Sequence, residues 1–146
     1  MTASGPAAGL SRTVAGLAAV VFVVISAGAC SNTVAGVNRR PHSGSASATL
    51  VNGVQQVMVQ ATDTYRFVPS TIVVHPGPVR IVLVNTGHGA PHNWSLTGFP
   101  ADFVPLTTAG QMQAATFVAP APGTYTFVCT IHVKQGQTGQ LIVVPN

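Results

Sequence analysis

The sequence predicts an all-β sandwich for the part of the chain that begins near Gln55. Short runs rich in β-branched and aromatic residues recur from there to the C-terminus, and turns containing Gly and Pro separate them. Few segments in that region have the pattern of an amphipathic helix. Short strands at this spacing are typical of a sandwich, and a length of 146 residues favours a single domain.

The expected strands follow one another in chain order. Val57 and Val59 alternate with polar neighbours in the first strand, and breaks such as 75–78 and 85–87 separate the later ones. The least regular stretch, 98–110, is expected to cross between the sheets. The strands are expected at 57–59, 65–68, 71–74, 79–84, 92–96, 111–118, 124–129 and 139–144.

Apolar residues that alternate along these strands are the expected core. Met58 and Met112 also occupy strand patterns and are interpreted as core residues. Alternation places Cys129 on the same strand face as Tyr125 and Phe127, so its thiol is expected in an apolar place. The expected core comprises Val57, Val59, Phe67, Ile72, Val74, Ile81, Leu83, Trp94, Phe117, Tyr125, Phe127, Leu141 and Val143.

Residues 1–29 have the pattern of a secretory signal peptide. Arg12 precedes an apolar run at 14–25, and small residues follow it. That run is shorter than a transmembrane helix needs. The sequence Ala-Gly-Ala before Cys30 resembles a bacterial lipoprotein signal, which implies a lipidated Cys30 at the mature N-terminus. The alternatives are an ordinary signal peptide, with Cys30 incidental, and a disulfide between Cys30 and Cys129.

Residues 30–53 are expected to form a flexible tether. They are rich in Ser, Asn, Gly, Ala and Thr and show no sustained periodicity. Such a stretch buries too little apolar surface to offset its ordering entropy. The expected protein is therefore exported and held by a lipid anchor on the outer face of the cell membrane, or otherwise secreted or periplasmic, with its folded domain at 54–146.

The charged residues argue against several classes of function. They make up 5% of the chain, and the net charge is +4. Asp63 and Asp102 are the only acids and lie in separate segments, which argues against paired carboxylate catalysis. No stripe of basic and aromatic residues favours nucleic acid as a partner. The protein is therefore not expected to be an enzyme or to bind nucleic acid.

Four residues near the strand ends have the chemistry of a metal site. His132 follows Cys129 by three residues, Gln137 lies five residues later, and His92 lies upstream. One thiolate, two imidazoles and a weak fourth ligand form a blue copper site. Zinc also takes Cys and His, but structural zinc sites usually close with a fourth strong ligand. His88, between glycines, is interpreted as an exposed loop residue, with a weak accessory metal contact as the alternative.

This arrangement resembles the cupredoxin family, specifically its plastocyanin-like branch. That family places a His after a strand and gathers Cys-x-x-His and a Met on the loop between the last two strands. The resemblance implies a cupredoxin-like Greek-key β-sandwich that binds one type 1 copper ion through His92, Cys129, His132 and Gln137. Gln137 stands in place of the usual Met, as in stellacyanin-like members, so a lower reduction potential is expected.

Residues around these ligands take their expected roles from the same resemblance. In the Pro-His-Asn element the Asn braces the ligand loop, which assigns that role to Asn93, with Thr130 as its hydrogen-bond partner. The edge of His132 is expected to reach solvent through an apolar docking surface for a redox partner protein. That surface comprises Ala90, Pro91 and Val133, with Lys134 at its rim.

One-electron transfer outside the cytoplasm by a monomer is the function that the ligand set favours. Copper storage, delivery or sensing without an electron-transfer role is the alternative. A role as part of a multicopper oxidase or reductase is less favoured, because a single ligand set lacks the additional histidines that such enzymes need.

Overall fold

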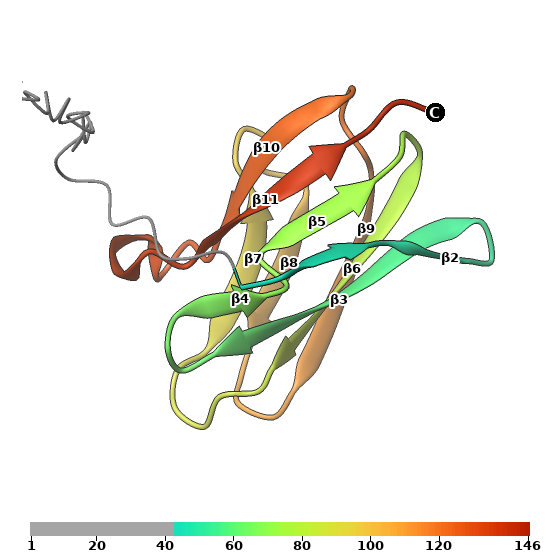
Figure 1. Cartoon of the computed structure of the whole chain (residues 1–146). Helices are drawn as coiled ribbons and strands as arrows, with labels where there is room; N and C mark the ends of the chain where they lie inside the picture. Colours follow the sequence, from blue (N-terminus) through green and yellow to red (C-terminus); the bar gives the residue numbers. More distant parts are fainter. Residues whose placement is uncertain (1–42) are drawn as a thin grey trace, which may run out of the picture. The chain divides into compact units, whose positions relative to one another are not determined.

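The computed structural model describes residues 43–146, which form eleven strands in two sheets and one short 3-10 helix, η1 (Val133–Gln135) (Figure 1). The two sheets pack face to face as a sandwich, so the all-β prediction is confirmed. No helix within 43–146 has the length and hydropathy needed to cross a bilayer.

The larger sheet holds six strands in the order β1-β5-β11-β10-β7-β8. The β1–β5 and β5–β11 pairs are parallel, and the other pairs are antiparallel. Its strands are β1 (Ser45–Ser47), β5 (Thr71–Val74), β11 (Thr138–Val143), β10 (Gly123–Val128), β7 (His92–Leu96) and β8 (Phe103–Thr107).

The smaller sheet holds five strands, four of them in the order β2-β3-β6-β9, and β4 pairs with β3. The β3–β6 pair is parallel, whereas β6 and β9 run antiparallel. Its strands are β2 (Thr49–Val51), β3 (Val54–Thr62), β4 (Arg66–Val68), β6 (Pro78–Asn85) and β9 (Met112–Val118).

Alternation along the strands builds the core between the sheets. In β3, Val57 and Val59 face inward while Met58 is 53% exposed. Aromatic rings fill the centre, where Phe127 lies 5.3 Å from Phe67 between ring centroids. Trp94 lies 5.1 Å from Phe127 and 5.6 Å from Phe117. Every residue of the expected core is buried except Tyr125, which is partly buried against it.

Three expectations about the fold need correction, the first being the end of the tether. The folded part begins at Ser43 rather than at residue 54, because β1 and β2 belong to the sheets. The backbone of β5 holds β1 in parallel register from Ser45 opposite Thr71, and Ser43 N donates to the Ser70 hydroxyl at 2.6 Å. Residues 30–42 of the tether, the signal peptide and Cys30 lie outside the described residues.

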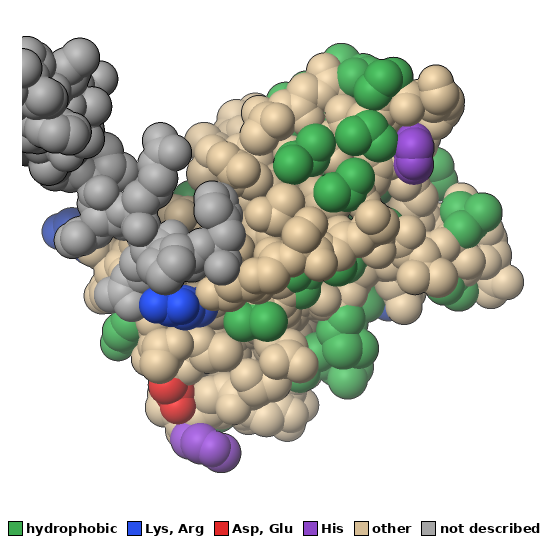
Figure 2. Space-filling model, in the orientation of Figure 1, with side chains coloured by type: hydrophobic (Ala, Val, Ile, Leu, Met, Phe, Trp, Pro, Cys, Tyr) green, Lys and Arg blue, Asp and Glu red, His purple; other side chains and the backbone are tan. Residues whose placement is uncertain are grey.

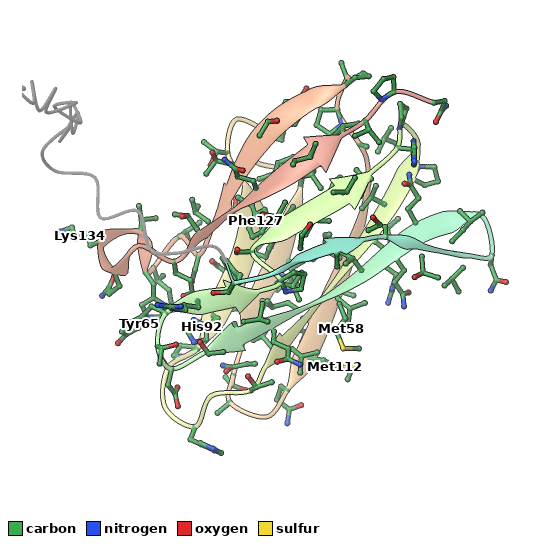
Figure 3. All side chains as sticks on the ribbon, viewed as in Figure 1. Met58, Tyr65, His92, Met112, Phe127 and Lys134 are labelled. Atoms are coloured by element: carbon green, nitrogen blue, oxygen red, sulfur yellow. The ribbon has the colours of Figure 1, made fainter. Side chains whose placement is uncertain are left out.

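The second and third corrections concern an unexpected strand and the two methionines. The stretch 98–110 contains β8, which pairs with β7 in the same sheet, so the crossing to the other sheet in this stretch comes after Thr107, at the end of β8. Met58 and Met112 are 53% and 61% exposed. In β3 the neighbours Val57 and Val59 take the inward positions, and Met112 lies at the exposed start of β9. Figure 3 shows both methionines on the β3–β6–β9 sheet, away from His92.

Candidate metal centre

The four expected ligands meet at one end of the sandwich. His92 is the first residue of β7, and Cys129 directly follows β10. His132 and Gln137 lie on the connection from β10 to β11. In Figure 1 this connection and the β3–β4 turn lie at the left end, opposite the β2–β3 hairpin. Because β7 and β10 are paired neighbours, their adjacent ends bring His92 to Cys129, and the turn after Cys129 brings His132.

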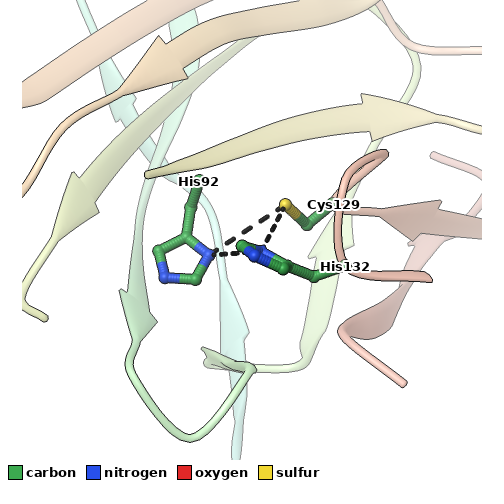
Figure 4. Close-up of side chains that lie close together, drawn as sticks. All are labelled: His92, Cys129 and His132. Atoms are coloured by element: carbon green, nitrogen blue, oxygen red, sulfur yellow. Dashed lines mark hydrogen bonds between the residues drawn. The ribbon is translucent and has the colours of Figure 1, made fainter. Parts of the chain in front are cut away.

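Three donor atoms converge in a buried place (Figure 4). Cys129 Sγ lies 3.4 Å from His132 Nδ1 and 4.0 Å from His92 Nδ1. The two Nδ1 atoms are 3.2 Å apart. Cys129 and His92 are fully buried, His132 is 9% exposed, and Cys129 is a free cysteine. Cys30, its partner in the alternative disulfide, lies outside the described residues.

Gln137 supplies a fourth polar atom to the same place. Its side chain is fully buried, and Oε1 lies 2.8 Å from His92 Nδ1. The Nε2 of Gln137 is buried with no hydrogen-bond partner among residues 43–146. The side chain of Gln137 therefore points into the site rather than lying on the surface of the loop.

Backbone hydrogen bonds shape the ligand loop without any contribution from a metal. The N–H of Cys129 donates to the carbonyl of Gln137 at 3.0 Å. This hydrogen bond closes the neck of the loop, where its first and last residues meet. His132 N donates to the carbonyl of Cys129 at 3.0 Å, so the tight turn brings both ligands to the same side. Gly136 ends η1 with φ 78°, a conformation that Gly adopts without strain.

Asn93 and Thr130 join the two ligand segments, as expected. Asn93 Nδ2 donates to the Thr130 hydroxyl at 2.7 Å, and Thr130 N donates to Asn93 Oδ1 at 2.8 Å. Each residue is the chain neighbour of a ligand, so the pair fixes the spacing between His92 and Cys129. The predicted hydrogen bond is confirmed, and a second one accompanies it.

Sequence reasoning missed the residues that hold the loop before His92. Asn85 is fully buried and donates to the carbonyls of Ala90 at 2.8 Å and Thr107 at 3.0 Å. Asp63 accepts from the backbone N–H groups of His88 at 2.8 Å and Gly89 at 3.3 Å. The sequence showed Asn85 only as part of a turn and Asp63 only as an isolated acid, because their partners lie in other segments.

Tyr65 is a further residue at the site that the sequence did not single out. It lies in the turn between β3 and β4, and its ring centroid is 4.8 Å from that of His132 and 6.5 Å from that of His92. Figure 3 shows Tyr65 and His92 side by side, with Lys134 on the ligand loop beyond them. The side chain of His88 is exposed and stands outside the donor group.

The electrostatic surroundings favour a neutral imidazole at His92 and a charged carboxylate at Asp63. Burial lowers the pKa of His92, the hydrogen bond to Gln137 opposes this shift, and the nearby His132 adds to it. A neutral ring leaves one nitrogen lone pair for a metal. The pKa of Asp63 is lowered chiefly because backbone N–H groups of His88 and Gly89 donate to its carboxylate. Figure 2 shows how few charged side chains lie on the visible face.

The donor spacing fits one metal ion. Three donors bound in a plane at about 2.0–2.3 Å from one ion lie about 3.5 Å apart. The separations of 3.2, 3.4 and 4.0 Å bracket that value. A thiolate and two imidazoles with a weak amide oxygen suit copper better than zinc, which favours four strong ligands. The residues present therefore fit a single copper ion.

Comparisons with known proteins agree with this fold. The sequence matches the family described as a cupredoxin-like domain over residues 18–143. A search of curated proteins finds no match. Auracyanin A, a "blue" copper protein from Chloroflexus aurantiacus, is 23% identical, with a TM-score of 0.55, and the likeness covers 62% of this chain and 99% of auracyanin A.

Two further solved structures share the fold. Reduced auracyanin from Roseiflexus castenholzii is 20% identical, with a TM-score of 0.54, covering 62% of this chain and 97% of its own. The metal-binding domain of the Cu(I)-exporting P-type ATPase CopA of Streptococcus pneumoniae, solved with Cu(I), is 20% identical, with a TM-score of 0.55. That likeness covers 70% of this chain and 97% of the CopA domain.

The family match spans both ligand segments and all eleven strands of the sandwich. On these grounds the chain belongs to the cupredoxin-like family.

Proposed function

We propose that this protein is a blue copper protein that carries single electrons between partner proteins. The observation that supports the proposal is the convergence of one thiol, two imidazole nitrogens and one amide oxygen in a buried place. Copper bound there would supply a centre that changes by one electron between Cu(I) and Cu(II).

Fixed donors suit a carrier because the two copper states prefer different geometries. The neck hydrogen bond between Cys129 and Gln137 and the Asn93–Thr130 pair hold the ligand segments independently of a metal. These contacts need not change when the charge at the site changes. Burial of the donors also keeps water away, so little solvent has to reorganise.

Copper storage or delivery is the second candidate, and the likeness to the CopA domain favours it. Repeated reduction and reoxidation of the copper-loaded full-length protein distinguishes the two functions. A carrier should exchange electrons rapidly at a single potential and keep one copper ion through the cycles. Slow exchange, with copper passing to a competing chelator after each reduction, would support storage or delivery instead.

The proposed exit for electrons is the surface around His132. This ring is 9% exposed, while Ile131 and Val133 beside it are 49% and 50% exposed. Ala90 and Pro91, before the other histidine, are half-buried. Weak redox complexes use small interfaces, below about 1,200 Å², so an apolar patch of this kind suffices.

Val133→Asp should slow electron exchange with a partner that docks on the apolar patch, because a carboxylate would then be desolvated in the interface. Stopped-flow kinetics measure the rate, and the copper spectrum should stay the same. Lys134→Ala is the comparison variant on the same helical turn. It should change mainly the on-rate with an acidic partner and its salt dependence. Unchanged exchange in Val133→Asp would place the exit elsewhere.

Gln137→Met should raise the reduction potential of the copper-loaded protein. A thioether is a softer donor than an amide oxygen and favours Cu(I) over Cu(II). Each tenfold change in the ratio of the two copper affinities corresponds to about 59 mV for one electron. Voltammetry of the two proteins measures the shift. A potential that stays constant or falls would show that Gln137 is not an axial ligand.

A further inference from the structure

Tyr65 contacts both histidines of the metal centre without being a ligand. Its ring centroid is 4.8 Å from that of His132 at an interplanar angle of 52°, and 6.5 Å from that of His92 at 72°. The two imidazole rings are themselves 4.9 Å apart. The three rings therefore form one cluster. Tyr65 is half-buried and is the most exposed of the three residues.

The backbone of Tyr65 adopts an unfavourable conformation. Its φ is 57°, and within 43–146 the only other non-glycine residue with positive φ is Asn52, in the β2–β3 hairpin. Asn tolerates this region, whereas a bulky aromatic residue there is a clear outlier. Such strain persists only where the surroundings dictate it, and it is concentrated at functional sites.

Contacts with the loop before His92 hold the strained turn. Tyr65 N donates to the carbonyl of Thr62 at 3.0 Å. Two residues before Tyr65, the Asp63 carboxylate accepts from the backbone of His88 and Gly89. A Cβ on Gly87 would collide with that carboxylate, so a larger residue there would displace Asp63 from its contacts with the loop. The turn that carries Tyr65 is thus fastened to the segment that delivers His92.

The outer nitrogen of His92 lacks the contact that usually orients a metal-binding imidazole. Ligating histidines generally donate the second ring N–H to a carbonyl, carboxylate or water. His92 Nε2 is buried and has no hydrogen-bond partner among the described residues. Since no hydrogen bond restrains that nitrogen, packing has to orient the ring, and Tyr65 is an aromatic residue in edge-to-face contact with it, at 6.5 Å between ring centroids.

We propose that Tyr65 is a positioning residue that holds the imidazoles of His92 and His132 in their metal-receiving orientation and shields them from small molecules in solution. This inference rests on the proposed copper site. The Tyr65 ring packs on both imidazoles and is more exposed than either of them. The hydrogen bonds that Asp63 accepts from the loop before His92 keep the turn in place although the backbone of Tyr65 is strained.

The test compares Tyr65→Gly with Tyr65→Phe in the full-length protein. Gly adopts positive φ without strain, so Tyr65→Gly removes the ring and relieves the backbone together. Tyr65→Phe keeps the ring and removes only the hydroxyl. Tyr65→Asn, which also tolerates positive φ, repeats the ring deletion if the Gly variant unfolds. Urea denaturation identifies which variants remain folded.

The first measurement needs no copper. Diethylpyrocarbonate modifies exposed imidazoles, and mass spectrometry of the copper-free protein gives the rate at His92 and His132. Loss of the ring should raise this rate towards the rates of exposed histidines, because the imidazoles lose the side chain that packs on them, whereas Tyr65→Phe should retain the protection. His75 and His88, which are exposed, provide internal reference rates.

The second measurement uses the copper-loaded protein. Transfer of Cu(I) to bathocuproine disulfonate should be about tenfold faster in Tyr65→Gly than in Tyr65→Phe. Equal modification and transfer rates in the two variants would overturn the inference. If the parent protein binds no copper, the proposed function fails, while the copper-free rates still decide whether Tyr65 shields the imidazoles.

Discussion

Replacing Cys129 with Ser is expected to abolish the strong visible absorption band of the Cu(II)-loaded protein and most of its copper affinity. The thiolate is the only soft donor among the four converging atoms. A hydroxyl at the same place is a poor substitute, because it stays protonated near neutral pH and binds copper weakly. The loss should exceed the roughly 10–100-fold that removal of an outer hydrogen-bond partner costs.

Absorption spectroscopy and a competition titration with a copper chelator measure this effect. Cys129 is buried, and Ser is close to it in size, so the sandwich should remain folded in the variant. Thiol deletion therefore acts on the metal rather than on the fold, which urea denaturation of the copper-free proteins can verify. An unchanged visible band in Cys129→Ser would refute the assignment of the ligand set.

Gly139→Ala is expected to destabilise the fold by about 3 kcal/mol or more, the upper end of the cost of overpacking. Gly139 is buried in β11 opposite Phe127. A Cβ there would collide with the Phe127 ring and lie 2.5 Å from the carbonyl oxygen of Ser70. The ring is packed against Phe67 and Trp94, and Ser70 accepts a hydrogen bond from Gln140 N at 2.8 Å, so neither can withdraw easily.

Gly123→Ala is the matched control for this prediction. Gly123 lies on the paired strand β10, and like Gly139 it does not require positive φ. A Cβ there would make an ordinary contact of 3.4 Å with Tyr125. Urea denaturation of the copper-free proteins should show a large loss of stability in Gly139→Ala and little change in Gly123→Ala. Equal stabilities would show that the core around Phe127 relaxes more than its packing implies.

The parts of the site that are local in sequence could be predicted. The spacing from Cys129 to His132 is set by one tight turn, and Asn93 and Thr130 are chain neighbours of ligands. Strand alternation likewise identified nearly the whole core, because the period of two is a direct consequence of strand geometry. Features that depend on the geometry of a single segment can therefore be predicted from the sequence of that segment.

The remaining parts depend on contacts between distant segments. Asp63 and Tyr65 reach the site only because β3 is paired with β6 and the following turn meets the loop before His92. The strand β1 has an unremarkable composition and is held by the backbone of its partner β5. No pattern within these segments indicates their partners, so a single sequence could not reveal them.

The neck hydrogen bond between Cys129 and Gln137 extends the β10–β11 ladder by one rung, and β7, which begins with His92, pairs with β10 on the other side. An ion held by these residues would cross-link three adjacent strands, β7, β10 and β11. Melting of this sheet and release of the ion would then be a single event. The melting temperature would then rise with the free copper concentration. The free energy of unfolding would increase by about 2.7 kcal/mol when that concentration is one hundred times the dissociation constant.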